Sequence, residues 1–334
     1  MRGEDTHEGE RIVQGIELTP EQPLDEVVSL AERAEAAGFD TILSSCHYFN
    51  RDPFAALVRI AAATETVRVG PGVVNPYETH PVALASRVAT LQEESGGRAV
   101  FGIGAGDAPT LSALGIERDR PLGRVLEAFE VARELWDGGS VDREGAVTAR
   151  GATLNYAVDP PPVYVGAQGP DMLRMAAKHA DGVLYNASHP RDVAWAAERV
   201  EEGLSERPAG RGEFDFVVQA SVSVAGEAEA ARETARQAAA VIAGGAAPPV
   251  LDRHGIDLNL AAEIGDLVSA GEFRSAFEKV SEAMIDAFCV AGTPADVADR
   301  IDAIREDADG VVAATPLGPD RGAAIDLLAD ATAP

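Results

Sequence analysis

The chain has 334 residues, of which 46% are hydrophobic and 25% charged, which excludes long disorder and allows a large core. Its 55 acidic residues outnumber its 28 basic ones, and the net charge of −27 argues against nucleic acid as a partner, because phosphate binding needs a basic surface. No apolar run approaches the roughly 20 residues that span a membrane, and the polar residues 1–10 hold no signal-peptide core. We expect a soluble cytoplasmic protein that binds neither nucleic acid nor membrane.

Short apolar runs alternate with amphipathic helical stretches along the chain. The first run, residues 11–18, predicts a strand, and helical spacing of apolar residues follows it until Gly38, which is placed to end that helix. Helical stretches near 53–64 and 80–95 separate the next runs. Seven further strands are expected at residues 41–45, 67–74, 99–104, 163–167, 182–186, 214–224 and 310–314.

Most of these runs are continuously apolar, which is typical of a parallel sheet buried on both faces. The run at 214–224 fits less well, because it contains Gln219, Ser221 and Ser223. Eight strand–helix units in a chain of this length favour an α/β fold of the (β/α)8 barrel type over an open doubly wound sheet.

Two stretches depart from this alternation. Residues 140–158 predict a hairpin before the fifth strand, and residues 226–292 predict a helical insertion before the eighth. We expect a single domain over residues 11–334, preceded by an extension at 1–10. The two cysteines, Cys46 and Cys289, predict neither a disulfide framework nor a zinc site, and we expect no metal.

The acidity is spread along the chain, and lysine occurs only at Lys178 and Lys279. Such a composition is typical of proteins that work in molar salt, where charge repulsion is screened over a few ångström. We therefore expect a salt-adapted (halophilic) protein. A merely acidic protein from a low-salt setting explains the scarcity of lysine less well.

The active site of a (β/α)8 barrel forms at the carboxyl ends of its strands. Polar residues and glycines follow most of the predicted strands and make up the candidate site. They are Glu17, His47, Gly72, Val73, Asn75, Gly104, Gly106, Asp107, Gln168, Gly169, Asn186, Ala187 and Ser188.

Taken singly, these residues have ordinary structural explanations. A strand-end carboxylate such as Glu17 or Asp107 is more often structural or solvated than catalytic. Residues 104–106 lack the GxGxxG spacing of a dinucleotide fold, and a tight turn is the better interpretation. No HExxH, P-loop lysine or GxSxG motif is present, which argues against zinc hydrolases, NTPases and α/β-hydrolases.

Taken together, the same residues predict a pocket for a large planar cofactor. Glycines allow the backbone to approach a flat ligand, and polar groups fix its orientation. Gly169-Pro170 could open a helix whose free N–H groups hold a phosphate.

At these motifs the sequence resembles the coenzyme F420-dependent methylenetetrahydromethanopterin reductases, a branch of the bacterial luciferase-like barrels. The resemblance runs from about Arg11 through nearly the whole chain, and residues 70–77 are its most specific part. It also includes residues 248–250, 253–255, 292–294 and 318–320.

The resemblance implies hydride transfer from reduced coenzyme F420 to the methylene carbon of a tetrahydropterin, a step of one-carbon metabolism. It implies a non-prolyl cis peptide at Gly72-Val73 and makes Glu17 the acid beside the reacting carbon. Asp107 and Gln168 match pocket residues that contact the pterin or the deazaflavin ring. The remaining candidate residues become cofactor-binding.

Several alternatives stay open at this point. The C1 carrier can be tetrahydromethanopterin or tetrahydrofolate, and the resemblance leads us to expect an Asp where the chain has Cys46. An FMN-dependent monooxygenase of the same superfamily and a non-catalytic cofactor-binding barrel are the competing hypotheses. We also expect a homo-oligomer.

Overall fold

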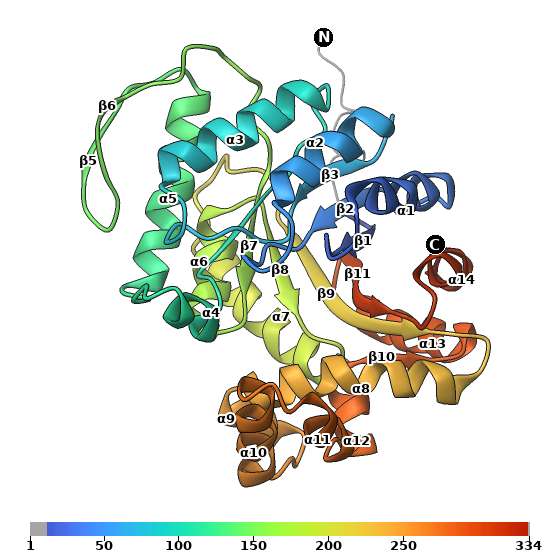
Figure 1. The fold of residues 1–334 in the computed structure, drawn as a ribbon. Helices are drawn as coiled ribbons and strands as arrows, with labels where there is room; N and C mark the ends of the chain where they lie inside the picture. Colours follow the sequence, from blue (N-terminus) through green and yellow to red (C-terminus); the bar gives the residue numbers. More distant parts are fainter. Residues whose placement is uncertain (1–11, 333–334) are drawn as a thin grey trace. The chain divides into compact units, whose positions relative to one another are not determined.

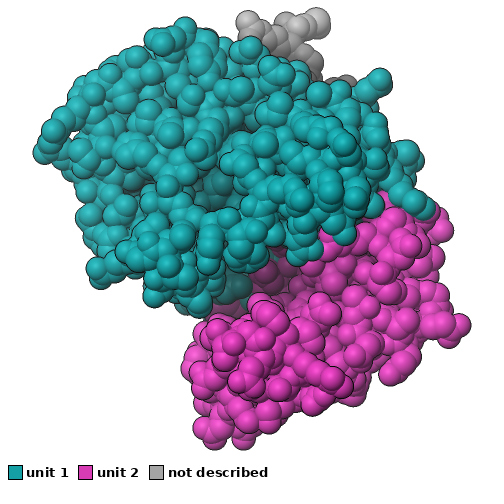
Figure 2. Space-filling view, viewed as in Figure 1, with its two compact units in different colours: residues 1–185, 198–217 teal, residues 186–197, 218–334 magenta. Residues whose placement is uncertain are grey.

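The computed structural model describes residues 12–332. The chain divides into two compact units (Figure 2). The first contains the chain up to Tyr185 together with Glu198–Val217, and the second contains Asn186–Ala197 and the chain from Val218 onward.

Parallel strands form the centre of the first unit (Figure 1). β2 pairs with β1 on one side and with β3 on the other, and Leu43 lies opposite both Glu17 and Gly70. β7 likewise pairs in parallel with β4 and β8, and a bridge joins Val74, beyond β3, to Ile103 of β4. The strands are β1 (Gln14–Leu18), β2 (Thr41–Ser44), β3 (Arg68–Pro71), β4 (Phe101–Gly104), β7 (Val163–Ala167) and β8 (Gly182–Asn186).

Helices α1, α2, α3 and α5 pack against one another in that order beside these strands. Helix α1 buries Val27, Ala31 and Ala34, which recur at helical spacing on one face. The side chains of Asp52 and His80 accept hydrogen bonds from the first turns of α2 and α3. The helices are α1 (Leu24–Ala36), α2 (Pro53–Ala63), α3 (Pro81–Glu94), α4 (Ala108–Ala113), α5 (Pro121–Trp136) and α6 (Pro170–His179), with α7 (Pro190–Leu204) belonging to both units.

The predicted hairpin is confirmed. β5 (Val141–Glu144) and β6 (Thr148–Ala152) pair antiparallel in the first unit, with a register shift between Val141 and Arg143. The turn of this hairpin is held at its base, because the N–H of Val147 donates to the carboxylate of Glu127 on α5 at 2.9 Å.

Arg98 joins the ends of two helices to the start of a strand. Its guanidinium donates to the backbone carbonyls of Ala61 and Thr64 at 2.9 Å each, and to that of Val67. Its Nε donates to the carbonyl of Ser95 at 2.9 Å. The carbonyls at helix ends lack partners within the helix, so one arginine satisfies several of them at once.

β9 (Asp215–Val224) belongs to both units, and its last residues, in the second unit, pair in parallel with β10 (Val290–Gly292). The second unit also contains β11 (Gly310–Leu317). The expected insertion at 226–292 consists of a helical cluster and β10. Gly244 and Gly265 lie in backbone contact where two of its helices cross. The helices of this unit are α8 (Ala228–Gly245), α9 (Pro248–Arg253), α10 (Leu258–Ser269), α11 (Phe273–Glu278), α12 (Glu282–Phe288), α13 (Pro294–Arg305) and α14 (Arg321–Thr332).

All eight predicted strands are present, as β1, β2, β3, β4, β7, β8, β9 and β11. The predicted length of the third is wrong: β3 ends at Pro71, and the cis peptide expected at Gly72-Val73 follows it and is confirmed. The seventh predicted run, which fitted less well because of its polar residues, is a strand that is buried throughout. Its polar Ser223 is accommodated because the hydroxyl donates to the carbonyl of Ala231 at 2.7 Å. The proposed extension at 1–10 lies outside the described residues. No helix between residues 12 and 332 is long and apolar enough to cross a membrane.

Candidate active site

Glu17 is a buried carboxylate at the end of β1, with 7% of its surface exposed. Gly72, in the loop beyond β3, lies beside it: an added Cβ there would stand 3.4 Å from Oε2 of Glu17 and 3.1 Å from Cβ of Leu43. The tight contact is the one with Leu43, so glycine at position 72 lets the loop beyond β3 pack against β2.

Cys46, which was not predicted as a site residue, lies close enough to Glu17 to feel its charge. Its thiol donates to the carbonyl of Ser44 at 3.3 Å, and the N–H of Gly72 donates to that same carbonyl at 2.8 Å. The pKa of the Cys46 thiol is raised, chiefly by burial and then by the negative charge of Glu17. The thiol is therefore a neutral neighbour of the carboxylate. Its only signal in the sequence is its place between β2 and His47.

The residues that follow Cys46 form an exposed aromatic group. His47 is exposed, and its ring stacks on that of Phe49 with 5.1 Å between the ring centres. Tyr48 is 53% exposed and Phe49 67% exposed, and their rings meet edge to face. Such rings can cover a flat ligand.

Val73, the second residue of the cis peptide, packs against glycines of β4 and β7. An added Cβ on Gly104 would stand 2.8 Å from Cγ2 of Val73, and one on Gly166 would stand 2.9 Å from it. At Gly102 the place of a side chain is also occupied, since an added Cβ would stand 2.0 Å from the carbonyl oxygen of Pro71. Gly102 and Gly166, which were not predicted as site residues, thus shape the site by leaving room for Val73.

Asn75 is buried, and its amide is engaged within its own loop. Its Oδ1 accepts the N–H groups of Tyr77 and Glu78 at 3.0 Å each, and its Nδ2 donates to the carboxylate of Glu78. Gly106 has a φ of +71°, and an added Cβ there would stand 3.2 Å from the side chain of Asn75. The loops beyond β3 and β4 therefore pack together at this contact, and Arg118 donates to the carbonyl of Gly106 at 3.0 Å.

Asp107 caps a helix. It is exposed, and one oxygen accepts the N–H of Thr110 at 2.9 Å in the first turn of α4. The second oxygen remains available to a ligand, because the carboxylate has several lone pairs.

Gln168 and Gly169 follow β7 and are both exposed. Gly169 directly precedes α6 and has no side chain with which to cap the N–H groups of that helix. An added Cβ on Gly169 would meet nothing within 4 Å. Open space beside uncapped helical N–H groups is what a phosphate requires.

The last candidate residues lie in the second unit. Asn186 is exposed, whereas Ala187 and Ser188 are buried. The hydroxyl of Ser188 accepts the N–H of Ser221 at 3.1 Å, and Arg300 donates to the carbonyl of Ser188 at 3.4 Å. These bonds fix the backbone of the segment against β9.

A cluster of charged and aromatic residues adjoins Ser188 in this unit. Asp192 accepts a hydrogen bond from Arg253 and lies 2.7 Å from Nε2 of His254, and all three side chains are largely buried. The ring of His189 meets that of His254 edge to face at 4.9 Å. The pKa of His189 is lowered to about 4, chiefly by burial and then by the charge of Arg300.

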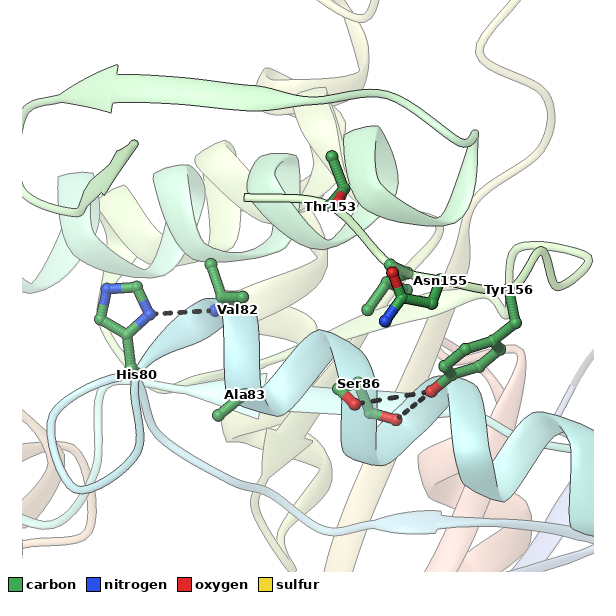
Figure 3. Close-up of a pocket in the computed structure, with 8 residues that line it drawn as sticks. His80, Val82, Ala83, Ser86, Thr153, Asn155 and Tyr156 are labelled. Carbon is green, nitrogen blue, oxygen red and sulfur yellow. Dashed lines mark hydrogen bonds between the residues drawn. The ribbon is translucent and has the colours of Figure 1, made fainter. Parts of the chain in front are cut away.

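A separate surface cavity of about 400 Å³ lies over the start of α3 (Figure 3). Tyr156 donates to the carbonyl of Ser86 at 3.1 Å along one wall, and Nε2 of His80 lies 2.9 Å from the carbonyl of Thr148. None of the predicted site residues lines this cavity, so it is not part of the candidate site. Within residues 12–332 no group of three His, Cys, Asp or Glu side chains is placed to hold a metal ion.

Parallel strands followed by helices, with a buried carboxylate and glycine-lined loops at the strands' carboxyl ends, define the class of α/β barrel enzymes. A family model described as luciferase-like monooxygenase matches residues 8–309.

Three relatives of known name show which group of enzymes within this class the chain resembles. The chain is 40% identical to a 5,10-methylenetetrahydromethanopterin reductase of Archaeoglobus fulgidus, over 94% of this chain and 96% of the relative. It is 36% identical to the reductase of the same name from Methanolobus tindarius, over 94% and 97%. The solved structure of the coenzyme F420-dependent tetrahydromethanopterin reductase from Methanopyrus kandleri matches with a TM-score of 0.89 at 35% identity, covering 96% of this chain and 97% of that one.

The chain belongs to the luciferase-like family and, within it, to the 5,10-methylenetetrahydromethanopterin reductases. The (β/α)8 barrel predicted from its sequence is confirmed by the match to the M. kandleri structure.

Proposed function

We propose that this chain transfers a hydride from reduced coenzyme F420 to the methylene carbon of a 5,10-methylene-tetrahydropterin, which gives the methyl form. The proposal is supported by family membership and by relatives whose names give this reaction and this cofactor. The observation that carries it is Glu17, a buried carboxylate against the Gly72 backbone at the carboxyl end of β1.

The site fits a flat, phosphate-bearing cofactor. The uncapped start of α6 beyond Gly169, with open space beside it, suits a phosphate. At Gly72, Gly104 and Gly106 the place of a side chain is taken by neighbouring residues, so these glycines serve the packing of the loops around the site. When bound, reduced F420 supplies the hydride. In the first unit its ring and side chain would be held by His47, Gly72, Val73, Asn75, Gly104, Gly106 and Gly169, while Asn186, Ala187 and Ser188 of the second unit stay predictions from the sequence.

Glu17 has the position of a general acid. The five-membered ring of the methylene-tetrahydropterin must open to an iminium before the carbon accepts hydride, and opening requires a proton on the departing ring nitrogen. Burial of Glu17 would keep water away from that proton. Asp107 and Gln168, both exposed at strand ends, would orient the pterin or deazaflavin ring.

One titration tests the function. The purified protein in molar KCl is titrated separately with F420, FMN and NADPH, and then given reduced F420 with methylene-tetrahydromethanopterin or methylene-tetrahydrofolate. We expect F420 to bind and one methylene-pterin to oxidise the reduced form. Binding of FMN without F420 would favour the monooxygenase alternative. Binding of F420 without turnover of either pterin would favour the non-catalytic barrel.

Other predictions from the sequence accompany this proposal. We propose a salt-adapted enzyme of one-carbon metabolism that works as a homo-oligomer in the cytoplasm and binds no nucleic acid. The proposal of one domain over residues 11–334 also stays a prediction.

A further inference from the structure

Two exposed aromatic rings follow β2 at its carboxyl end. Phe49 is the most exposed of the large hydrophobic side chains that the structure describes, at 67%, and its neighbour Tyr48 is 53% exposed. The Phe49 ring stacks on that of His47 and meets the Tyr48 ring edge to face. These contacts leave most of the surface of Tyr48 and Phe49 in water. Single exposed apolar side chains are ordinary, but adjacent large ones are typical of a binding surface.

The loop that carries the rings is tied to the loop that follows Glu17. Before the rings, the hydroxyl of Ser45 donates to that of Thr19 at 3.1 Å. After them, the guanidinium of Arg51 donates to the carbonyl of Glu21 at 2.6 Å. The rings are therefore joined on both sides to the chain directly beyond β1.

This arrangement places the rings at the strand end that holds the buried carboxylate. Leu43 of β2 lies opposite Glu17 of β1. The Cys46 thiol donates to the carbonyl of Ser44, which also accepts the N–H of Gly72, the residue beside Glu17. Since an extended residue spans at most about 3.6 Å, the backbone of residues 48–49 lies within about 11 Å of that of Cys46.

The chemistry of the reaction requires an aromatic ring of the substrate at this place. In a 5,10-methylene-tetrahydropterin the methylene carbon bridges N5 of the pterin and N10, and N10 is bonded directly to an aryl ring. N10 is the nitrogen that departs when the five-membered ring opens, so it is the atom that the general acid protonates. The aryl ring is thus one bond away from the atom that Glu17 serves.

We propose that Tyr48 and Phe49 bind the aryl ring that the C1 carrier bears on N10. This inference rests on the proposed function. Aromatic rings prefer offset-stacked or edge-to-face contacts, and the two side chains, whose planes lie 80° apart, offer both a face and an edge. The aryl ring is common to tetrahydromethanopterin and tetrahydrofolate, so the inference holds for either carrier.

Equilibrium binding tests the inference without turnover. Tetrahydromethanopterin, tetrahydrofolate and F420 are titrated separately, without oxygen and in molar KCl, into the unmodified protein, Tyr48→Leu, Phe49→Leu and Phe49→Trp. Leucine keeps an apolar side chain but removes the flat face, whereas tryptophan keeps it. Phe273→Leu is the matched control, because Phe273 is 52% exposed at the start of α11 in the second unit.

We expect each of the two leucine variants near Glu17 to weaken binding of whichever carrier the unmodified protein binds by about 3- to 10-fold, the usual effect of losing an aromatic pair. Phe49→Trp and Phe273→Leu should leave that Kd within about twofold. The Kd of F420 should stay within about twofold in every variant, because the contact is with the carrier alone.

Unchanged carrier binding in both leucine variants would overturn the inference. Equal losses in Phe49→Leu and Phe49→Trp would also overturn it, since a flat face would then not be what the ligand needs. A loss of F420 binding as large as the loss of carrier binding would overturn it too, because the rings would then serve the cofactor or the fold of the site. Failure of the unmodified protein to bind either carrier would overturn the proposed function, and this inference with it.

Discussion

Cγ2 of Val73 lies 2.8 Å from the position that a Cβ on Gly104 would take. The loop beyond β3 thus packs directly on the backbone of β4, and the two strand ends can approach only because position 104 has no side chain. The same valine lies against Gly166 of β7. One apolar side chain therefore links three strand ends beneath the proposed cofactor site.

Gly104→Ala should force Val73 out of its place. Overpacking of this kind typically costs about 1–3 kcal/mol of stability, and we expect a comparable loss in the free energy of unfolding in urea. Adding Val73→Ala should recover part of that loss, since the shorter side chain removes the clash. Gly123→Ala is the matched control, because a Cβ there meets nothing within 4 Å on helix α5 and should be neutral or slightly stabilising. Equal effects at positions 104 and 123 would refute the packing argument.

Arg98→Ala should destabilise the first unit, because it leaves the carbonyls of Ala61, Thr64 and Val67 without their shared donor. We expect a loss of about 3 kcal/mol, since removing one partner of a charged hydrogen-bond network leaves buried groups unsatisfied. Arg59→Ala is the comparison. Its ion pair with Asp25, 2.6 Å long, is largely exposed, and such pairs contribute at most about 1 kcal/mol. Urea unfolding of the two variants measures the difference.

His189 should make the protein less stable in acid. Burial and the nearby charges of Arg300 and His254 lower its pKa to about 4, whereas an unfolded histidine titrates near 6.5. Between these values the unfolded chain binds a proton that the folded chain does not. This contribution to stability is therefore full above pH 6.5 and is lost as the pH falls toward 4.

His189→Gln removes that titration, and its unfolding free energy should fall less steeply between pH 6.5 and pH 4. Asp192, Arg191 and His254 face the same ring and are kept unchanged in this comparison. Parallel pH curves for the variant and the unmodified protein would contradict the assignment.

Glu17→Gln should lower turnover far more than cofactor affinity. Loss of a general acid typically costs about 100- to 10,000-fold in rate, while F420 binding depends on other groups. The measurement is single-turnover oxidation of reduced F420 by the methylene-pterin that the unmodified enzyme uses, beside a binding titration of the same variant. Single-turnover rates that match those of the unmodified enzyme would remove Glu17 from the mechanism.

The net charge of −27 should make stability depend on salt. Repulsion among surface carboxylates opposes folding in dilute buffer and is screened over about 3 Å at 1 M salt. We expect the Tm to rise steadily from dilute buffer to several molar KCl. A flat or falling Tm would contradict the salt-adapted interpretation.

Much of the fold could be predicted from the sequence, because strands and helices are marked by local patterns. The alternation of apolar runs with helical spacing located all eight barrel strands, the hairpin at β5 and β6, and the helices between 226 and 292. The end of β3 was missed, since the apolar residues beyond Pro71 look like more strand. β3 ends there instead, and Val73 packs against Gly104 and Gly166, which lie far along the sequence.

For the candidate site too, local sequence patterns determine one part and the tertiary structure determines the other. The sequence by itself determined which residues stand at strand ends, because position after an apolar run is a local property, and Glu17, Asp107 and Gln168 were found on that basis. Only the tertiary structure decided which of them share a contact. It placed Glu17 against Gly72, brought Cys46 beside it, and turned the amide of Asn75 toward Glu78. The first two relationships join residues from different loops, and they form only when parallel strands bring those loops to one edge of the sheet.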